Sequence, residues 1–180
     1  MLKSYQYIYY MIQLNSIWDV ISAYVLICAY FGVYRALDGD FELLLGFFMT
    51  HTIENNTKRM TASLPYPGIF KRPDGATNCS IMNSGGPVGD RGGFPSGHMA
   101  ATTYFMSYLY FRSKDTSLRS KLYHYTPVAG MALARYMKGC HNGYQIVAGY
   151  LLGLGVAYWG DWVKRKYGAD SLLKLNAWTG

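Results

Sequence analysis

The chain has 180 residues, of which 51% are hydrophobic and 15% charged, and its formal net charge is +7. This length suits one core, so we treat residues 1–180 as a single domain. Sparse charge and abundant tyrosine favour a membrane protein over a soluble helical bundle, although the mean hydropathy is near zero. The basic residues form short clusters between apolar segments, at 111–121 and 162–168, which is typical of cytosolic loops and argues against nucleic-acid binding.

The apolar pattern predicts six helices in chain order, at 4–14, 17–36, 41–60, 97–112, 121–138 and 143–166. The first lies in an aromatic-rich segment without a small-residue cleavage site, so we interpret it as retained and not as a signal peptide. The uncharged stretches 92–111 and 139–160 are each long enough to cross the roughly 30 Å hydrocarbon layer as helices. The predicted fold is therefore an all-α, six-helix, membrane-embedded bundle with multi-pass topology.

A long irregular stretch at 63–93 separates the third and fourth predicted helices. Loops of this length in compact domains are normally functional or disordered, and the proline, glycine and embedded charges here favour a lid or site wall. In the last helix, Gly149 and Gly153 have the spacing of small residues that permits close helix contact in lipid. The three cysteines include no Cys-x-x-Cys pair, so we expect neither a metal nor a redox cofactor.

The sequence PSGH at 95–98 stands at the start of the fourth predicted helix. We expect Ser96 to cap this helix, which leaves the amides of Gly97 and His98 and the helix dipole to bind an anion. The alternative is a capped helix whose histidine merely faces solvent. Taken alone, this segment does not separate the two interpretations.

Three other side chains at similar membrane-boundary positions favour the anion site. Arg135 ends one predicted helix, His141 begins the next six residues later, and Arg72 lies in the long loop. Singly, each has an ordinary explanation, as a helix-dipole partner, a structural histidine or a solvated turn residue. Together, two arginines that can bind phosphate oxygens and two histidines that can move protons or accept a phosphoryl group predict phosphoryl chemistry.

In this order, RP at 72–73, PSGH at 95–98 and the spacing from Arg135 to His141 resemble the signature of the type 2 phosphatidic acid phosphatase superfamily. That family contains membrane lipid phosphatases, isoprenoid diphosphate phosphatases, glucose-6-phosphatase and soluble vanadium haloperoxidases, and the resemblance covers about residues 55–150. It implies a six-helix core and a metal-independent, two-step phosphoryl transfer, with His141 as nucleophile and His98 as acid and then base. It also implies that the phosphoryl oxygens are held by a lysine of the first motif together with Arg72, Ser96, Gly97 and Arg135.

The first motif departs from the family pattern. Its lysine normally stands six residues before the Arg-Pro pair, a position that is Pro65 here. The candidates are Lys58, which we prefer because it ends a predicted helix, and Lys71, next to the arginine. His51 and Glu54 share a helix face with Lys58, and this face either lines the site or reflects ordinary core polarity, the interpretation we favour for both.

The third motif also departs, because the family aspartate four residues after the nucleophile is Gln145 here. A glutamine can fix the imidazole tautomer but supplies no charge, and a neutral amide in the equivalent place of a serine-protease triad lowers turnover about 10⁴-fold. Dolichyl diphosphate phosphatases are similar to this chain in carrying glutamine there, and a diphosphate has a better leaving group than a monoester. Gln145→Asp should therefore be faster if missing charge limits the rate, and should collapse if the pocket is built around the amide.

The resulting prediction is an integral membrane phosphatase for a lipid phosphate or an isoprenoid diphosphate. A catalytically weak or inactive membrane protein on the same scaffold is the main alternative, a soluble haloperoxidase is a third, and a homo-oligomer or larger membrane or particle assembly stays open. Once the basic residues assigned to catalysis are set aside, helix parity puts most lysines and arginines on the face opposite the site, so the positive-inside rule predicts a site on the non-cytosolic face. Cys79 and Cys140 fall on that face, either as a disulfide or as two free thiols.

Overall fold

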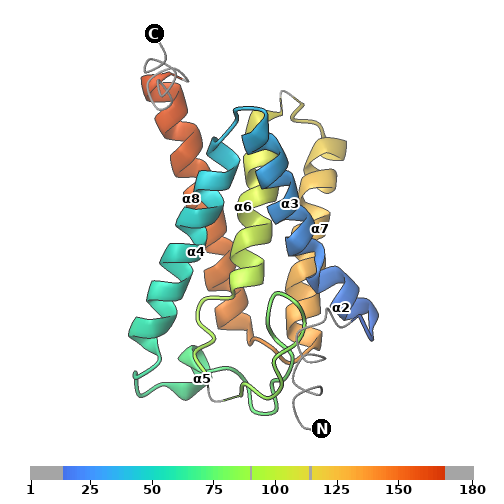
Figure 1. Cartoon of the computed structure of the whole chain (residues 1–180), viewed down its shortest axis with the longest axis vertical. Coiled ribbons are helices and arrows are strands. Elements are labelled where there is room, and N and C mark those ends of the chain that lie inside the picture. Colours follow the sequence, from blue (N-terminus) through green and yellow to red (C-terminus); the bar gives the residue numbers. More distant parts are fainter. Residues whose placement is uncertain (1–13, 90, 114, 169–180) are drawn as a thin grey trace, which may run out of the picture.

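The computed structural model describes residues 14–89, 91–113 and 115–168 (Figure 1). Every regular element in this part of the chain is helical, and the helices are α2 (Ile17–Ser22), α3 (Tyr24–Leu37), α4 (Glu42–Thr61), α5 (Pro67–Phe70), α6 (Gly97–Arg112), α7 (Leu118–Met137) and α8 (Gly143–Tyr167). The prediction of an all-α bundle with a long loop after the 41–60 helix is thus confirmed. The predicted helix at 4–14 lies outside the described residues except for its last position.

The predicted helix boundaries agree closely with the structure, with two differences. The helix expected at 17–36 is interrupted at Ala23, which separates α2 from α3. α7 begins at Leu118 and not at 121, because the side chain of Ser117 caps it by accepting a hydrogen bond from the Ser120 amide. α6 runs over 97–112 as expected.

α6 is the central helix, and α3, α4, α7 and α8 surround it (Figure 1). It carries no formal charge before Arg112, so it can be buried on all sides. Its buried positions include Met99, Tyr104, Phe105 and Met106, which belong to the main hydrophobic cluster of the described residues. The core therefore lies along α6, which begins within the PSGH segment.

Glycines bring α8 against α6 at van der Waals distance. A Cβ atom at Gly149 would lie 2.5 Å from the carbonyl oxygen of Ser96, and one at Gly153 would lie 2.2 Å from that of Ala100. Side chains at either position would collide with the α6 backbone, so the small-residue spacing read from the sequence does mark a close helix contact. This contact also shows that α6 and α8 run in the same direction and begin at the same end of the bundle.

That end collects the segments that matter for the site. α4 and α7 finish there, α6 and α8 begin there, and the loop between α4 and α6 lies across it (Figure 1). Two helical stretches among the described residues are long and apolar enough to cross a membrane, Ile17–Leu37 and Gly143–Tyr167. α6 has 16 residues and is shorter than the uncharged run at 92–111, because the chain before Gly97 is loop.

Candidate active site

A cavity of about 300 Å³ opens at this end of the bundle. Its walls come from α3, α4, the long loop, α6 and the α7–α8 turn. The lining side chains are Val25, Thr50, His51, Glu54, Asn55, Lys58, Arg72, Cys79, Ser80, Ile81, Gly97, His98 and His141. Residues from all three sequence motifs therefore line one cavity, although Lys58 and His141 are 83 positions apart along the chain.

His141 is 2% exposed and both of its ring nitrogens have partners. Nδ1 lies 3.0 Å from Gln145 Oε1, and Nε2 lies 3.1 Å from Arg72 Nη1. Because an amide oxygen can only accept, Nδ1 must carry the proton, which leaves the Nε2 lone pair facing the guanidinium and the cavity. Burial, reinforced by Arg72, Arg135 and Lys58, holds the pKa of His141 well below its ordinary value, so the ring is neutral at pH 7.

Gln145 is fully buried and uses both ends of its amide. While Oε1 accepts from His141, Nε2 donates to the carbonyl oxygens of Ile69, at 3.0 Å, and Lys71, at 2.6 Å. The amide thus orients the imidazole and at the same time holds the segment that leads into Arg72. Gln145, which replaces the family aspartate, therefore also contacts the segment that carries the altered first motif.

Arg72 is fixed by the turn that carries His141. Its Nη1 donates to the carbonyl oxygen of Cys140 at 3.1 Å, and the backbone at Gly93 leaves room for it. A Cβ atom at Gly93 would lie 2.9 Å from Arg72 Cγ and 2.7 Å from Gln145 Oε1. Glycine is therefore needed where the loop passes between the guanidinium stem and the amide.

At the start of α6, two buried polar atoms lack a hydrogen-bond partner. They are Ser96 Oγ and His98 Nε2. Ser96 takes the N-cap position, but its side chain does not cap the helix, so that expectation is wrong. Its hydroxyl is fully buried, and its backbone amide instead donates to the Gln145 carbonyl at 2.9 Å. His98 lines the cavity, so an oxyanion bound there would give its Nε2 a partner, whereas Ser96 is not among the lining residues.

Arg135 lies behind the cavity wall and does not line the cavity. It is fully buried, and its Nη2 donates to the carbonyl oxygen of Cys79 at 2.9 Å while Nη1 donates to Ser22 Oγ at 3.3 Å. The guanidinium therefore contributes positive charge from behind the cavity wall, and its Nε–H has no partner.

Lys58 lines the cavity, where it is ion-paired with Glu54 one turn earlier on α4. Lys71 does not line it and contributes its carbonyl oxygen to Gln145. The preference for Lys58 as the site lysine is consistent with this arrangement. His51 and Glu54 also line the cavity, which is the less favoured of the two interpretations of their shared helix face with Lys58, because helical spacing fits core polarity equally well. The buried carboxylate of Glu54 is the acidic group in this wall.

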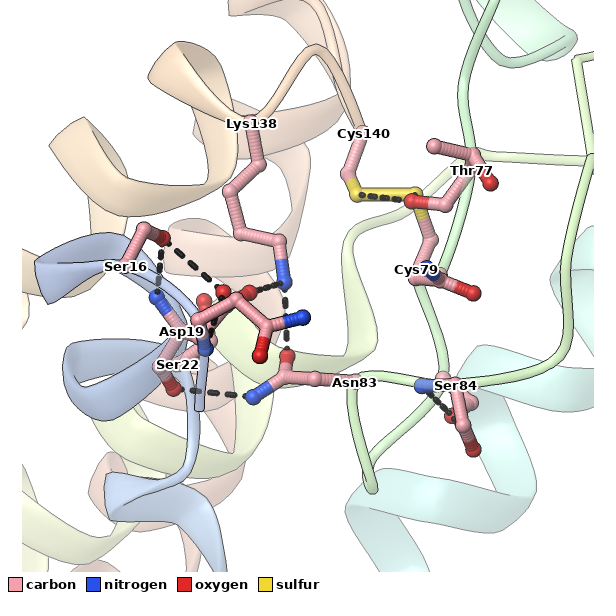
Figure 2. Close-up of polar contacts among 12 residues, drawn as sticks. Ser16, Asp19, Ser22, Thr77, Cys79, Asn83, Ser84, Lys138 and Cys140 are labelled. Atoms are coloured by element: carbon pink, nitrogen blue, oxygen red, sulfur yellow. Dashed lines mark hydrogen bonds and ion pairs between the residues drawn. A yellow bond between two sulfur atoms is a disulfide. The ribbon is translucent and has the colours of Figure 1, made fainter. Parts of the chain in front are cut away.

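A disulfide joins Cys79 to Cys140, which decides between the two states that the sequence left open. Figure 2 shows it linking the long loop to the α7–α8 turn, beside an ion pair between Lys138 and Asp19. Asn83 completes this cluster by accepting from Lys138 Nζ at 2.8 Å and donating to the Asp19 carbonyl at 2.8 Å. The loop is therefore tied to both α2 and α7.

Comparison with known proteins places these motifs in a family. The family model of the PAP2 superfamily matches residues 41–167, which include α4, α6, α7 and α8. They also include every residue that lines the cavity except Val25. Comparison with curated proteins and with solved structures gives no significant match. The match covers more than half of the chain. The chain belongs to the PAP2 superfamily, whose members are generally phosphatases that act on phosphorylated substrates.

Proposed function

We propose that this protein is an integral membrane phosphatase that hydrolyses a lipid phosphate or a polyprenyl diphosphate through a phosphohistidine on His141. The observation that carries the proposal is the neutral, oriented imidazole of His141, whose Nε2 lies 3.1 Å from Arg72 in the cavity shared with His98 and Lys58. A nucleophile, a second imidazole and two cations around one hollow suit in-line attack on phosphorus.

The proposed reaction has two steps, and His98 serves in both. In the first, His141 Nε2 forms the P–N bond while the P–O bond to the leaving group breaks and His98 gives that oxygen a proton. In the second, His98 takes a proton from a water molecule as its oxygen attacks phosphorus, the P–N bond breaks, and inorganic phosphate is released. Gln145 keeps the Nδ1 proton in place throughout, so the same nitrogen attacks each time.

In this proposal the equatorial oxygens are held by Lys58, Arg72, the Ser96 hydroxyl and the Gly97 amide. Arg135 supports them from behind the cavity wall through its charge. In this proposal the unpartnered Ser96 Oγ, next to the cavity-lining Gly97, engages the bound phosphoryl group. These cations supply the positive charge themselves, which supports a metal-independent reaction.

A lipid substrate is supported by the outer surface of the bundle. Large hydrophobic side chains are exposed on every long outer helix, among them Ile27, Tyr30, Phe48, Leu133, Val147, Leu151 and Tyr158. Together with the two candidate spans, this surface suits a multi-pass protein in a bilayer. The tail of the substrate would then lie in lipid while its phosphate reaches the cavity.

A site on the non-cytosolic face is supported by two features. Once the proposed site residues Lys58, Arg72 and Arg135 are set aside, lysines and arginines are more numerous at the opposite end of the bundle, where they are Arg35, Arg112, Arg119, Lys121, Lys164, Arg165 and Lys166. The disulfide beside the cavity suits an oxidising compartment.

Phosphate release from phosphatidate, a polyprenyl phosphate and a polyprenyl diphosphate, measured in detergent with and without chelator, tests the proposal. We expect His141→Ala to abolish release and His98→Ala to accumulate labelled phosphoenzyme. Full activity in both variants would refute the assignment.

A non-enzymatic membrane protein on the same scaffold is the second candidate, and the uncharged Gln145 favours it. Protection from heat by phosphate or vanadate that disappears in Arg135→Ala would speak for the enzyme, whereas no protection in the wild type would speak for this alternative.

A further inference from the structure

Glu54 occupies the place where an anion is expected to bind. Its side chain is 3% exposed, and it belongs to the penultimate turn of α4, facing the start of α6. A Cβ atom at Gly97 would lie 2.8 Å from Glu54 Oε1, so the carboxylate rests against the first residue of that helix. Helix N-termini attract anions through their free amides and their dipole. At the start of α6 this position is taken by the carboxylate of Glu54.

The groups that face this carboxylate are almost all basic. On α4 itself they are Lys58, its ion-pair partner, and His51, whose Nδ1 lies 3.4 Å from Glu54 Oε2. From the other elements packed around the cavity they are His98 on α6, Arg72 in the loop and His141 in the α7–α8 turn, with Arg135 behind them. Among the residues lining the cavity, Glu54 alone is acidic. It therefore balances part of a cluster that holds three fixed cations.

We propose that Glu54 is an affinity-setting residue of the phosphate site, a built-in anion that competes with the phosphoryl group for Lys58 and for the start of α6. In the free protein it keeps Lys58 engaged, and an incoming phosphate must take that lysine over. After hydrolysis the carboxylate recovers Lys58, which helps inorganic phosphate to leave. This inference rests on the proposed function, because it assumes that the cavity binds a phosphate group.

The inference differs from a purely structural role in the sign of the expected effect. If Glu54 only stabilised the fold, its removal would weaken the site and reduce phosphate binding. If it competes with phosphate, its removal leaves three cations without an opposing charge and binding becomes tighter. Tight binding of product then slows release, so kcat and KM should fall together.

The test compares Glu54→Gln with Glu42→Gln in the full chain in detergent. Glu42 lies at the other end of the same helix and pairs with Arg112 and Lys164, so its variant controls for the loss of a carboxylate and an ion pair on α4. Calorimetric titration with inorganic phosphate, and with sulfate as a dianion that does not titrate near neutral pH, gives the dissociation constants. We expect Glu54→Gln to bind both anions at least tenfold more tightly, about 1.4 kcal/mol, and Glu42→Gln to match the wild type.

An unchanged or weaker affinity in folded Glu54→Gln would overturn the inference. If that variant does not fold, Glu54→Asp decides, because it keeps the charge and withdraws the carboxylate from Gly97 by one methylene. We expect tighter phosphate binding there too, and an affinity equal to or weaker than the wild type would again overturn the inference. A wild type that hydrolyses lipid phosphates while Glu54→Gln leaves affinity unchanged refutes this inference alone. A wild type that binds phosphate but hydrolyses none of the panel refutes the proposed function alone.

Discussion

Gln145→Glu puts a charge beside the proposed nucleophile at almost constant side-chain volume. The structure predicts that this substitution lowers both the stability and the activity of the protein. Gln145 Nε2 donates to the carbonyl oxygens of Ile69 and Lys71, and a carboxylate cannot donate to either. Two lost hydrogen bonds cost about 2 kcal/mol, and a buried carboxylate oxygen facing two carbonyl oxygens adds about 1–3 kcal/mol. Of the two outcomes considered for Gln145→Asp, the structure therefore favours collapse over a gain in rate, since aspartate also lacks the donor.

The assay follows thermal unfolding in detergent together with phosphate release. A loss of about 3–5 kcal/mol in a chain of this size corresponds to a fall in Tm of roughly 10 °C. We expect that fall in Gln145→Glu, together with at least a hundredfold loss of turnover. Gln145→Met is the control without charge, because it also loses the two bonds donated by Nε2. It loses the acceptor for His141 Nδ1 as well, and we still expect it to be less destabilised than Gln145→Glu. A Gln145→Glu protein with wild-type Tm and a higher kcat would refute the reasoning, since the two carbonyl oxygens would then not need the amide.

Three further predictions follow from other parts of the structure. Replacing Cys79 and Cys140 by serine should lower the free energy of unfolding by about 4 kcal/mol, because the bridge closes a loop with a sequence separation of 61, and denaturant unfolding with and without reductant measures this. Gly153→Ala should cost about 1–3 kcal/mol by forcing α8 away from α6. Gly155→Ala, which meets nothing within 4 Å at an exposed helix position, should leave the stability unchanged or raise it by up to about 1 kcal/mol in the same thermal assay. Since burial depresses the pKa of His141, the unfolded state binds a proton that the folded state does not. The contribution of His141 to the stability should therefore be constant above about pH 7 and fall by up to about 1.4 kcal/mol per pH unit below about 6.5. A Tm profile of His141→Asn as steep as that of the wild type would contradict this origin.

The helices were predictable because their signals are local. The uncharged run after PSGH predicts α6, and the apolar run from Gly143 predicts α8. The interruption at Ala23 was not predictable, because no proline or glycine marks it. At that point the chain meets a distant group, since the buried hydroxyl of Ser22 accepts from Arg135 at 3.3 Å.

The site residues were predictable where the residue type alone limits the chemistry. They were not predictable where the path of the long loop determines the contacts of a side chain. His98, His141, Arg72 and Lys58 were expected together and do line one cavity. The second task of Gln145 depends on where the long loop passes, and no spacing in the sequence encodes that. Ser96 has the residue type and position of a helix cap, yet its hydroxyl is left without a partner.

The disulfide has a consequence for how the site matures. The carbonyl oxygen of Cys140 accepts a hydrogen bond from Arg72, and that of Cys79 accepts one from Arg135. The disulfide therefore joins the two residues whose carbonyl groups anchor the two guanidiniums. In a newly made chain with reduced thiols, only noncovalent contacts, such as those of Asn83 and Gln145, hold these two anchors together. Both guanidiniums should therefore be held less firmly before the cysteines are oxidised, so the cavity should reach its final geometry only after the disulfide has formed.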